Sequence, residues 1–281
     1  MVATISSFLI HHHLPSRASN RGKLRCLFNT LNIPLYEISD QEPIANKATS
    51  VKERLLVVSK ATLRIYSSAL IGWQCKGFPL SRCIKTFLAE TARAIALFLS
   101  YSTKEWTSAH RIRDVENILV SKHISSWQTG LASDSDWVLV CEDDAEIRSD
   151  TILRIKSLVM DQLKYVQSSA PLFIDLAGGY PPEMVLPIPP AQANSQSWTF
   201  KSILTNTTCS YLVSNGLVKL WLQQINLKPW LKNLPADHLI NMTSFQVCAS
   251  RNDCASWHWK RPIFLHGSFT NGSSSISSTR L

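Results

Sequence analysis

The stretch that decides the fold is Trp137–Asp150, WVLVCEDDAEIRSD. Its apolar start, residues 137–141, favours a β-strand, and three carboxylates follow directly, namely Glu142, Asp143 and Asp144. Such a short apolar run predicts a buried central strand that carries charge to its carboxyl-terminal end. In open α/β sheets, ligands bind at that end of the strands. We therefore expect a functional site directly after this strand.

The three adjacent carboxylates have two explanations. Carboxylates this close repel one another, and burial without partners is costly, so a divalent cation would relieve the repulsion. Hard oxygen ligands favour Mg²⁺ or Mn²⁺, which can also hold substrate phosphates. The alternative is a solvated acidic turn after a strand, and the tripeptide alone does not decide between the two.

Length and composition predict a globular protein. The chain has 281 residues, of which 45% are hydrophobic and 17% charged, which excludes a disordered chain. The longest apolar stretch, Thr86–Ser100, is interrupted by Glu90 and Arg93, so no spanning helix is expected. The N-terminus lacks a basic region and is interpreted as a strand, not as a signal peptide. The seven scattered cysteines form no CxxC pair, which favours reduced thiols in a cytoplasm.

The net charge of +9 is unevenly distributed along the chain. Residues 1–122 hold 17 Lys and Arg against 8 Asp and Glu, whereas residues 123–281 hold 12 of each kind. This asymmetry suggests an anionic partner: a membrane surface, a phosphorylated glycan or nucleic acid. A basic solvated face without a partner is the alternative, and it carries similar weight.

Apolar patterning predicts alternating strands and helices, and hence an α/β fold. A stripe formed by Leu24, Leu27, Phe28 and Leu31 indicates a helix from Ser19, its expected N-cap, to about residue 32. Further helices are expected over 115–131, from residue 149 or 150 to about 166, and from the N-cap Ser214 to about 225. Strands are expected over residues 4–10, 35–38, 172–176, 209–213 and 262–266.

Residues 47–106 differ from the rest of the chain. Apolar residues alternate there with Lys and Arg, which predicts two or three basic amphipathic helices. The structural interpretation is that these helices pack against the sheet. The functional interpretation is that they dock on an anionic membrane surface. A long Pro-rich loop over residues 181–197 and a Ser/Gly-rich tail complete the pattern.

The order of these motifs resembles that of glycosyltransferase family 25, the β-galactosyltransferases of lipooligosaccharide and lipopolysaccharide biosynthesis. The aliphatic strand ending in Glu-Asp-Asp matches residues 138–144, and a helix with His and Trp precedes it, with Lys122 where the family usually has Ser. Downstream, the strand–Ser–Gly–helix segment is matched by TNTTCSYLVSNGLVKLW. The remaining matches are His123, Trp127, Pro235, Asp237, Pro262, Ser268, Ser274 and Ile276, with Arg17 and Arg21 near the N-terminus.

The resemblance implies a single GT-A-like domain over residues 1–281, with a helical basic insertion at 45–110 and a mobile tail at 267–281. It also implies a mixed, mostly parallel central sheet and a UDP-sugar donor, most often UDP-galactose. The cofactor would be Mn²⁺ or Mg²⁺. The metal ligands would be Glu142, Asp143, Asp144 and His266, and the donor-binding residues His123, Asp144, Asp175 and Ser214.

An inverting transfer also needs a carboxylate base, and Asp237 is the candidate because it lies in a polar turn outside the metal cluster. The alternatives are a helix cap for Asp237, a core role for His123 and a local hydrogen bond for Asp175. The expected acceptor is a glycan or lipid-linked glycan. The expected location is cytoplasmic, peripheral to the inner face of the membrane, and no nucleic acid is expected. A non-catalytic glycan-binding relic and another metal-dependent nucleotide-using transferase remain the rival interpretations.

Overall fold

The computed structural model describes the core of the chain and leaves several segments undescribed. No helix within the described residues is long and apolar enough to cross a membrane. Most of the predicted 181–197 loop, most of residues 41–77 and the tail after Gly267 lie outside this part, together with Ser268, Ser274 and Ile276. The described residues are 3–12, 14–40, 78–99, 103–178, 190–193, 197–205 and 207–267, with scattered residues between 55 and 73.

The centre of the molecule is an eight-stranded sheet in the order β2-β1-β3-β8-β5-β9-β7-β6. β8 and β7 run opposite to the other six strands, so the predicted mixed, mostly parallel α/β sheet is confirmed. The strands are β1 Ile5–His12, β2 Leu35–Asp40, β3 Trp137–Glu142, β5 Leu172–Asp175, β6 Gln192–Ala193, β7 Ser197–Phe200, β8 Ser210–Ser214 and β9 Ala255–Trp259. A separate antiparallel pair joins β4, Ala145–Ile147, to β10, Phe264–His266.

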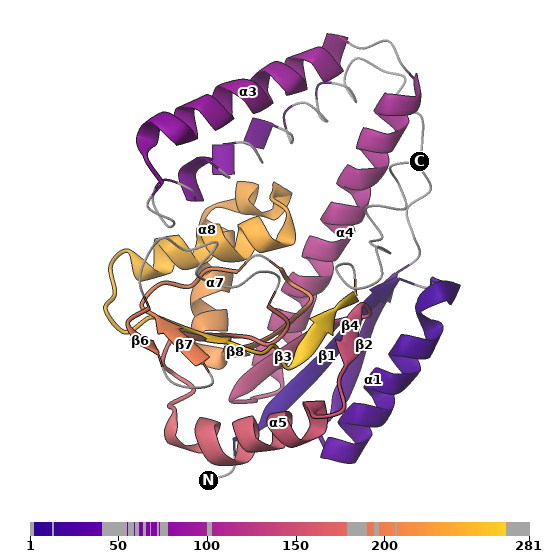
Figure 1. Cartoon of the computed structure of the whole chain (residues 1–281), viewed down its shortest axis with the longest axis vertical. Coiled ribbons are helices and arrows are strands. Elements are labelled where there is room, and N and C mark those ends of the chain that lie inside the picture. Colours follow the sequence, from indigo (N-terminus) through magenta and orange to yellow (C-terminus); the bar gives the residue numbers. More distant parts are fainter. Residues whose placement is uncertain are drawn as a thin grey trace.

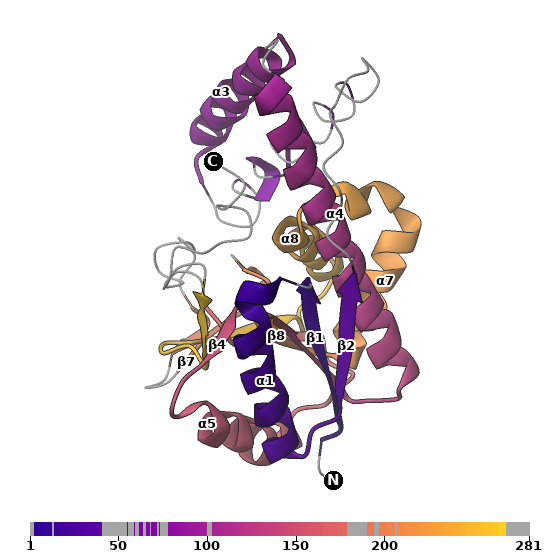
Figure 2. The ribbon, with the colours of Figure 1, turned by 90° about the vertical axis from the view of Figure 1, so that its right-hand side faces the viewer.

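Helices cover both faces of this sheet (Figures 1 and 2). α1 and α5 lie on one face, and α4, α7 and α8 on the other. The long α4 also extends past the sheet to α3, which lies away from it (Figure 1). The helices are α1 Ala18–Leu31, α3 Leu80–Leu99, α4 Thr103–Ala132, α5 Thr151–Ser157, α7 Asn215–Leu227 and α8 Ala236–Cys248, with shorter helical turns η1 Pro15–Arg17, η3 Leu158–Gln162, η4 Leu163–Tyr165 and η5 Pro229–Asn233.

Strand alternation explains the two cores. Successive side chains of a strand point to opposite faces. In β3, Val138 and Val140 join the core under α4, α7 and α8, whereas Trp137, Leu139 and Cys141 join the core under α1 and α5. A strand apolar on both faces must be covered on both sides, so the run at 137–141 already implied a layered α/β fold.

The predicted strands are all present, but the prediction missed β4, β6, β7 and β9. The predicted start of helix 115–131 is wrong, because α4 begins at Thr103. The predicted cap at Ser19 is also wrong: α1 begins after Arg17, without a side-chain cap. In contrast, Ser214 caps α7 as predicted, since its hydroxyl accepts a hydrogen bond from the Leu217 amide. The helix after Asp150 ends at Ser157 and continues as the turns η3 and η4.

Candidate functional site

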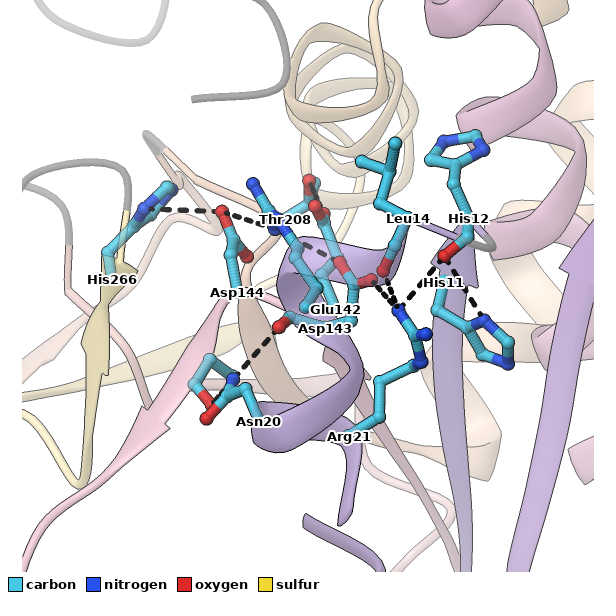
Figure 3. Close-up of polar contacts among 12 residues, drawn as sticks. His11, His12, Leu14, Asn20, Arg21, Glu142, Asp143, Asp144, Thr208 and His266 are labelled. Carbon is cyan, nitrogen blue, oxygen red and sulfur yellow. Dashed lines mark hydrogen bonds and ion pairs between the residues drawn. The ribbon is translucent and has the colours of Figure 1, made fainter. Parts of the chain in front are cut away.

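The three predicted carboxylates lie where β1 and β3 end side by side. Ile10 pairs with Glu142, and the Asp143 amide donates to the Ile10 carbonyl at 3.0 Å. On the other side, the Glu142 amide donates to the carbonyl of Cys209, just before β8. We call Glu142, Asp143 and Asp144 the acidic edge. Figure 3 shows that their side chains diverge toward different neighbours.

Glu142 is held by a directed hydrogen-bond network. The Trp127 indole donates to the Tyr211 hydroxyl at 2.8 Å, and that hydroxyl lies 2.8 Å from Nδ1 of His123. With Tyr211 donating to Nδ1, Nε2 of His123 donates to Glu142, 3.3 Å away, and Thr208 donates to the same oxygen. Burial opposes ionisation, but His123 and Thr208 hold the pKa of Glu142 below its ordinary value. His123 is fully buried, so it positions Glu142 from behind.

Asp143 is held by cations from the start of α1. One Asp143 oxygen lies 3.0 Å from Arg17 and the other 3.2 Å from Arg21. Asn20 donates to the Asp143 carbonyl, which fixes the backbone as well. Burial raises the pKa of Asp143 to about 6, Asp144 adds to the rise, and Arg17 and Arg21 oppose it. Both oxygens of this carboxylate therefore face guanidinium groups and are not available to a cation.

Asp144 turns toward the other side of the acidic edge, although one of its oxygens also lies 3.6 Å from Arg17. The same oxygen is 3.6 Å from Nδ1 of His266, which β10 brings back against β4, and the Cys209 thiol lies close by. One ligand atom from each of these three residues lies within 4.8 Å of the other two. Burial raises the pKa of Cys209 well above its ordinary value, and the charges of Asp144 and Glu142 raise it further.

A buried lysine adds positive charge beside the end of β1. Lys122 is buried, and its ammonium donates to the His11 carbonyl at 2.7 Å and lies 3.3 Å from Nδ1 of His12. Burial lowers the pKa of His12 to about 4, and Lys122 lowers it further. His12 is therefore neutral at pH 7 and accepts a hydrogen bond from the lysine. Lys122 therefore places a cation under the strand ends.

The other predicted donor-binding residues have local partners. Asp175, at the end of β5, accepts hydrogen bonds from the amides of Ala177 and Gly178 and lies 3.4 Å from Nδ1 of His258. The alternative of a local hydrogen bond thus describes its visible contacts. Ser214 pairs with Trp137 at the start of β3, the opposite end from Glu142. The structure therefore does not bring Ser214 together with the acidic edge, and its contacts account for a helix cap.

Asp237 lies in the first turn of α8, not in a turn outside a helix as predicted. Pro235 takes the N-cap position, so the alternative of a cap is also wrong. Asp237 and Asn241 are four residues apart and lie on one helix face. Asn241 exchanges hydrogen bonds with the backbone of Thr205, so this face is directed to the loop that leads to Thr208.

The donor set tests the predicted Mn²⁺ or Mg²⁺ site. Mg²⁺ requires an octahedral shell of oxygen ligands. Asp143 faces arginines, and one Glu142 oxygen, Oε1, faces His123 and Thr208, while Asp144 lies beside a thiol and an imidazole. These residues do not form an oxygen site suited to Mg²⁺.

Sequence reasoning missed several residues of this site. Cys209 was assigned to a strand, and Thr208 and Tyr211 were not singled out. Arg17 and Arg21, matched to the resemblance, received no role. Their spacing of four residues, with Arg17 at the N-cap of α1 and Arg21 in its first turn, was the available signal. Both arginines lie more than 120 residues from Asp143 in the sequence, and no local pattern indicated that they pair with it.

Comparison of the chain with models of protein families and with characterised proteins found no match.

Proposed function

We propose that this chain is a glycosyltransferase that transfers a sugar from a UDP-sugar to a glycan or lipid-linked glycan acceptor, with inversion. The observation that supports it is the acidic edge at the carboxyl end of β3 in a mixed, mostly parallel sheet, where α/β folds bind ligands. Galactose as the sugar and a GT-A-like version of the fold follow from the family resemblance and are part of the proposal.

In this proposal, one side of the acidic edge has a structural role and the other binds the donor. Arg17 and Arg21 neutralise Asp143 and join the start of α1 to the end of β3. These contacts hold the backbone at the end of β3 in place. Asp144 and His266 line the side where the donor diphosphate would bind. A bound divalent cation would supply positive charge toward the departing diphosphate.

Asp237 is the proposed base. It is partly exposed, and its face of α8 is directed to the loop before β8 through Asn241. A carboxylate in that position can take the proton of an acceptor hydroxyl that approaches from solvent. The acceptor would therefore bind between α8 and the acidic edge, opposite the arginine side.

Calorimetry with a panel of nucleotide sugars, followed by donor hydrolysis assays, tests this function. We expect one UDP-sugar to bind in the presence of divalent cation and to be hydrolysed slowly by water. Release of pyrophosphate from a nucleoside triphosphate would instead identify a nucleotidyl transferase. Glycan binding without nucleotide-sugar binding would identify a relic. Asp161→Asn, at an exposed position of η3, is the matched control for carboxylate variants.

The exposed side of α3 supports a second element of the proposal, contact with an anionic membrane surface. Its apolar residues Leu80, Ile84, Leu88 and Ile95 are about half exposed and fall within one arc of the helix. Residues 47–122 also carry 13 Lys and Arg against 5 Asp and Glu. We expect sedimentation with anionic liposomes at low salt that weakens with ionic strength and on Leu88→Gln. Equal sedimentation with neutral liposomes would contradict this contact.

A further inference from the structure

The inference concerns the chemistry of the site formed by Asp144, Cys209 and His266. The three residues come from different parts of the chain: the turn after β3, the residue before β8 and the end of β10. The β4–β10 pair brings His266 back beside Ala145, and the backbone bond from Glu142 to Cys209 brings the thiol to the same turn. Three independent elements thus converge on one point.

From this arrangement we propose that Asp144, Cys209 and His266 form a binding site for a transition-metal ion of the Zn²⁺ class, with a cysteine thiolate as ligand. Carboxylate oxygen, thiolate sulfur and imidazole nitrogen together form the donor set of zinc sites. A thiolate selects zinc over hard cations, and Mg²⁺ and Ca²⁺ prefer oxygen alone. The ion therefore differs from the Mn²⁺ or Mg²⁺ that the family resemblance implies.

The distances fit a single ion. Zn²⁺ lies about 2.0–2.3 Å from its ligands, so two ligand atoms of one tetrahedral ion are about 3.3–3.8 Å apart. The three ligand atoms here lie within 4.8 Å of one another, so small side-chain rotations are enough to reach that range. Three protein ligands leave the fourth tetrahedral position open, as in catalytic zinc sites, and a phosphate oxygen or water can take it.

The charges around this point are mostly negative, and Arg17 is a cation that faces it: its guanidinium lies 3.6 Å from an Asp144 oxygen and would share that carboxylate with a bound ion. Cys209 is 1% exposed, and its thiol lies close to the Asp144 carboxylate, which is an unusual neighbour for a cysteine that serves only to fill the core. Glu142 contributes a further negative charge nearby. His266 is the most exposed of the three ligands and marks the side from which an ion enters.

The relevance of this metal to transfer rests on the proposed function, but its binding does not. Titration of the full-length apoprotein with Co²⁺, without nucleotide, is the direct test. A thiolate ligand gives a sulfur-to-cobalt charge-transfer band in the near ultraviolet, and tetrahedral coordination gives intense visible bands. We expect both bands at one equivalent of Co²⁺, and Zn²⁺ should displace the cobalt whereas excess Mg²⁺ should not.

Cys209→Ser separates the thiolate from general packing. The variant should lose the charge-transfer band and at least tenfold in Zn²⁺ affinity. Cys141→Ser is the matched control, because Cys141 is equally buried on neighbouring β3 and hydrogen-bonds Ser210 instead. Circular dichroism measures whether both variants fold. If Cys209→Ser does not fold, His266→Gln provides the second test. A missing band in wild type, a band that persists in Cys209→Ser, or displacement of cobalt by Mg²⁺ would overturn the proposal. UDP-sugar binding that survives any of these outcomes would leave the proposed function standing.

Discussion

Asp143 and Asp144 are neighbours in sequence, yet their carboxylates face two different sides of the acidic edge (Figure 3). On the α1 side, Asp143 lies between Arg17 and Arg21, which neutralise it from a helix packed against the sheet. On the β10 side, Asp144 lies beside Cys209 and His266, whose atoms can act as metal ligands. Arg17 contacts both carboxylates and lies 3.6 Å from Asp144.

This difference teaches that a run of like charges is not one functional unit. The turn after β3 gives the two carboxylates different neighbours apart from the shared Arg17, so Asp143 joins α1 to the sheet and Asp144 faces the thiol and the imidazole. Charge pairing on the α1 side also reduces the repulsion that the β10 side would otherwise suffer.

The largest expected effect lies outside both sides of the acidic edge, at Asp237. If neither side supplies the base, Asp237→Asn should lower transfer to acceptor by roughly 10²–10⁴ while donor and metal binding stay unchanged. Asparagine keeps the size of the side chain, and loss of charge in the first turn of α8 costs the helix at most about 1 kcal/mol. Kinetic assays beside Asp161→Asn measure this. A transfer rate within a few-fold of wild type would remove the base assignment, and Asp175 and Asp253 would be tested next.

The next largest effect is expected in stability, on the α1 side. Arg21 is buried and bonds Asp143 together with the carbonyls of His12 and Leu14. Arg21→Met should therefore lower the free energy of unfolding by about 3–5 kcal/mol, because it removes one of the two guanidinium groups that pair with the buried Asp143 carboxylate.

Arg25→Met is the matched control for this prediction. Arg25 lies one turn further along α1 and pairs with Glu37 on the exposed surface. Such a pair contributes about 0–1 kcal/mol. Urea unfolding at pH 7 compares the two variants, and equal losses would show that the buried pairing has no special structural role.

The pH dependence of stability gives a further test of Asp143 on the α1 side. The expected effect is smaller, and its direction follows from the pKa shift. The pKa of Asp143 rises from 3.8 to about 6 on folding, so the folded state binds this proton more tightly than the unfolded chain. Its stabilising contribution is complete below pH 3.8 and is lost as the pH rises to 6, by about 3 kcal/mol at most.

His12 acts in the opposite direction. Its pKa falls from 6.5 to about 4 on folding, so its contribution to stability is lost as the pH falls through that range. The two trends offset each other in wild type. Asp143→Asn removes one of them, so its stability should rise more steeply than that of wild type between pH 4 and 6. Parallel curves from urea unfolding across this range would contradict the assignment.

The fold was largely predictable from the sequence, because apolar runs report burial directly. Residues 137–141 are apolar on both faces and indicated a covered central strand. The missed strands have weaker signals: β4 has three residues, and β9 mixes Ser and His with tryptophans. The true start of α4 was missed because residues 103–114, its first part, lack an apolar stripe that continues through residues 115–131.

The site was only partly predictable, because its contacts are long-range. The run Glu142–Asp144 located it, and His123 was correctly placed on one face with Trp127. Which carboxylate meets both arginines and which meets the thiol depends on the turn after β3 and on the return of β10. Neither feature leaves a local pattern, so Cys209 was interpreted as part of a strand alone.

The smallest effect is expected on donor binding, and it compares the two carboxylates directly. Asp144→Asn removes one ligand charge with little change of shape, and should weaken metal-dependent UDP binding tenfold or more, which corresponds to about 1.4 kcal/mol. Asp143→Asn should weaken it less, because its carboxylate faces Arg17 and Arg21 and reaches Asp144 only through the shared Arg17. Calorimetry at fixed metal concentration measures both, with Asp161→Asn as the surface control. Equal weakening by the two substitutions would show that the acidic edge binds the donor as one cluster, and the distinction between its two sides would fail. No weakening by Asp144→Asn would place the donor elsewhere, because this is the carboxylate that the imidazole and the thiol both face.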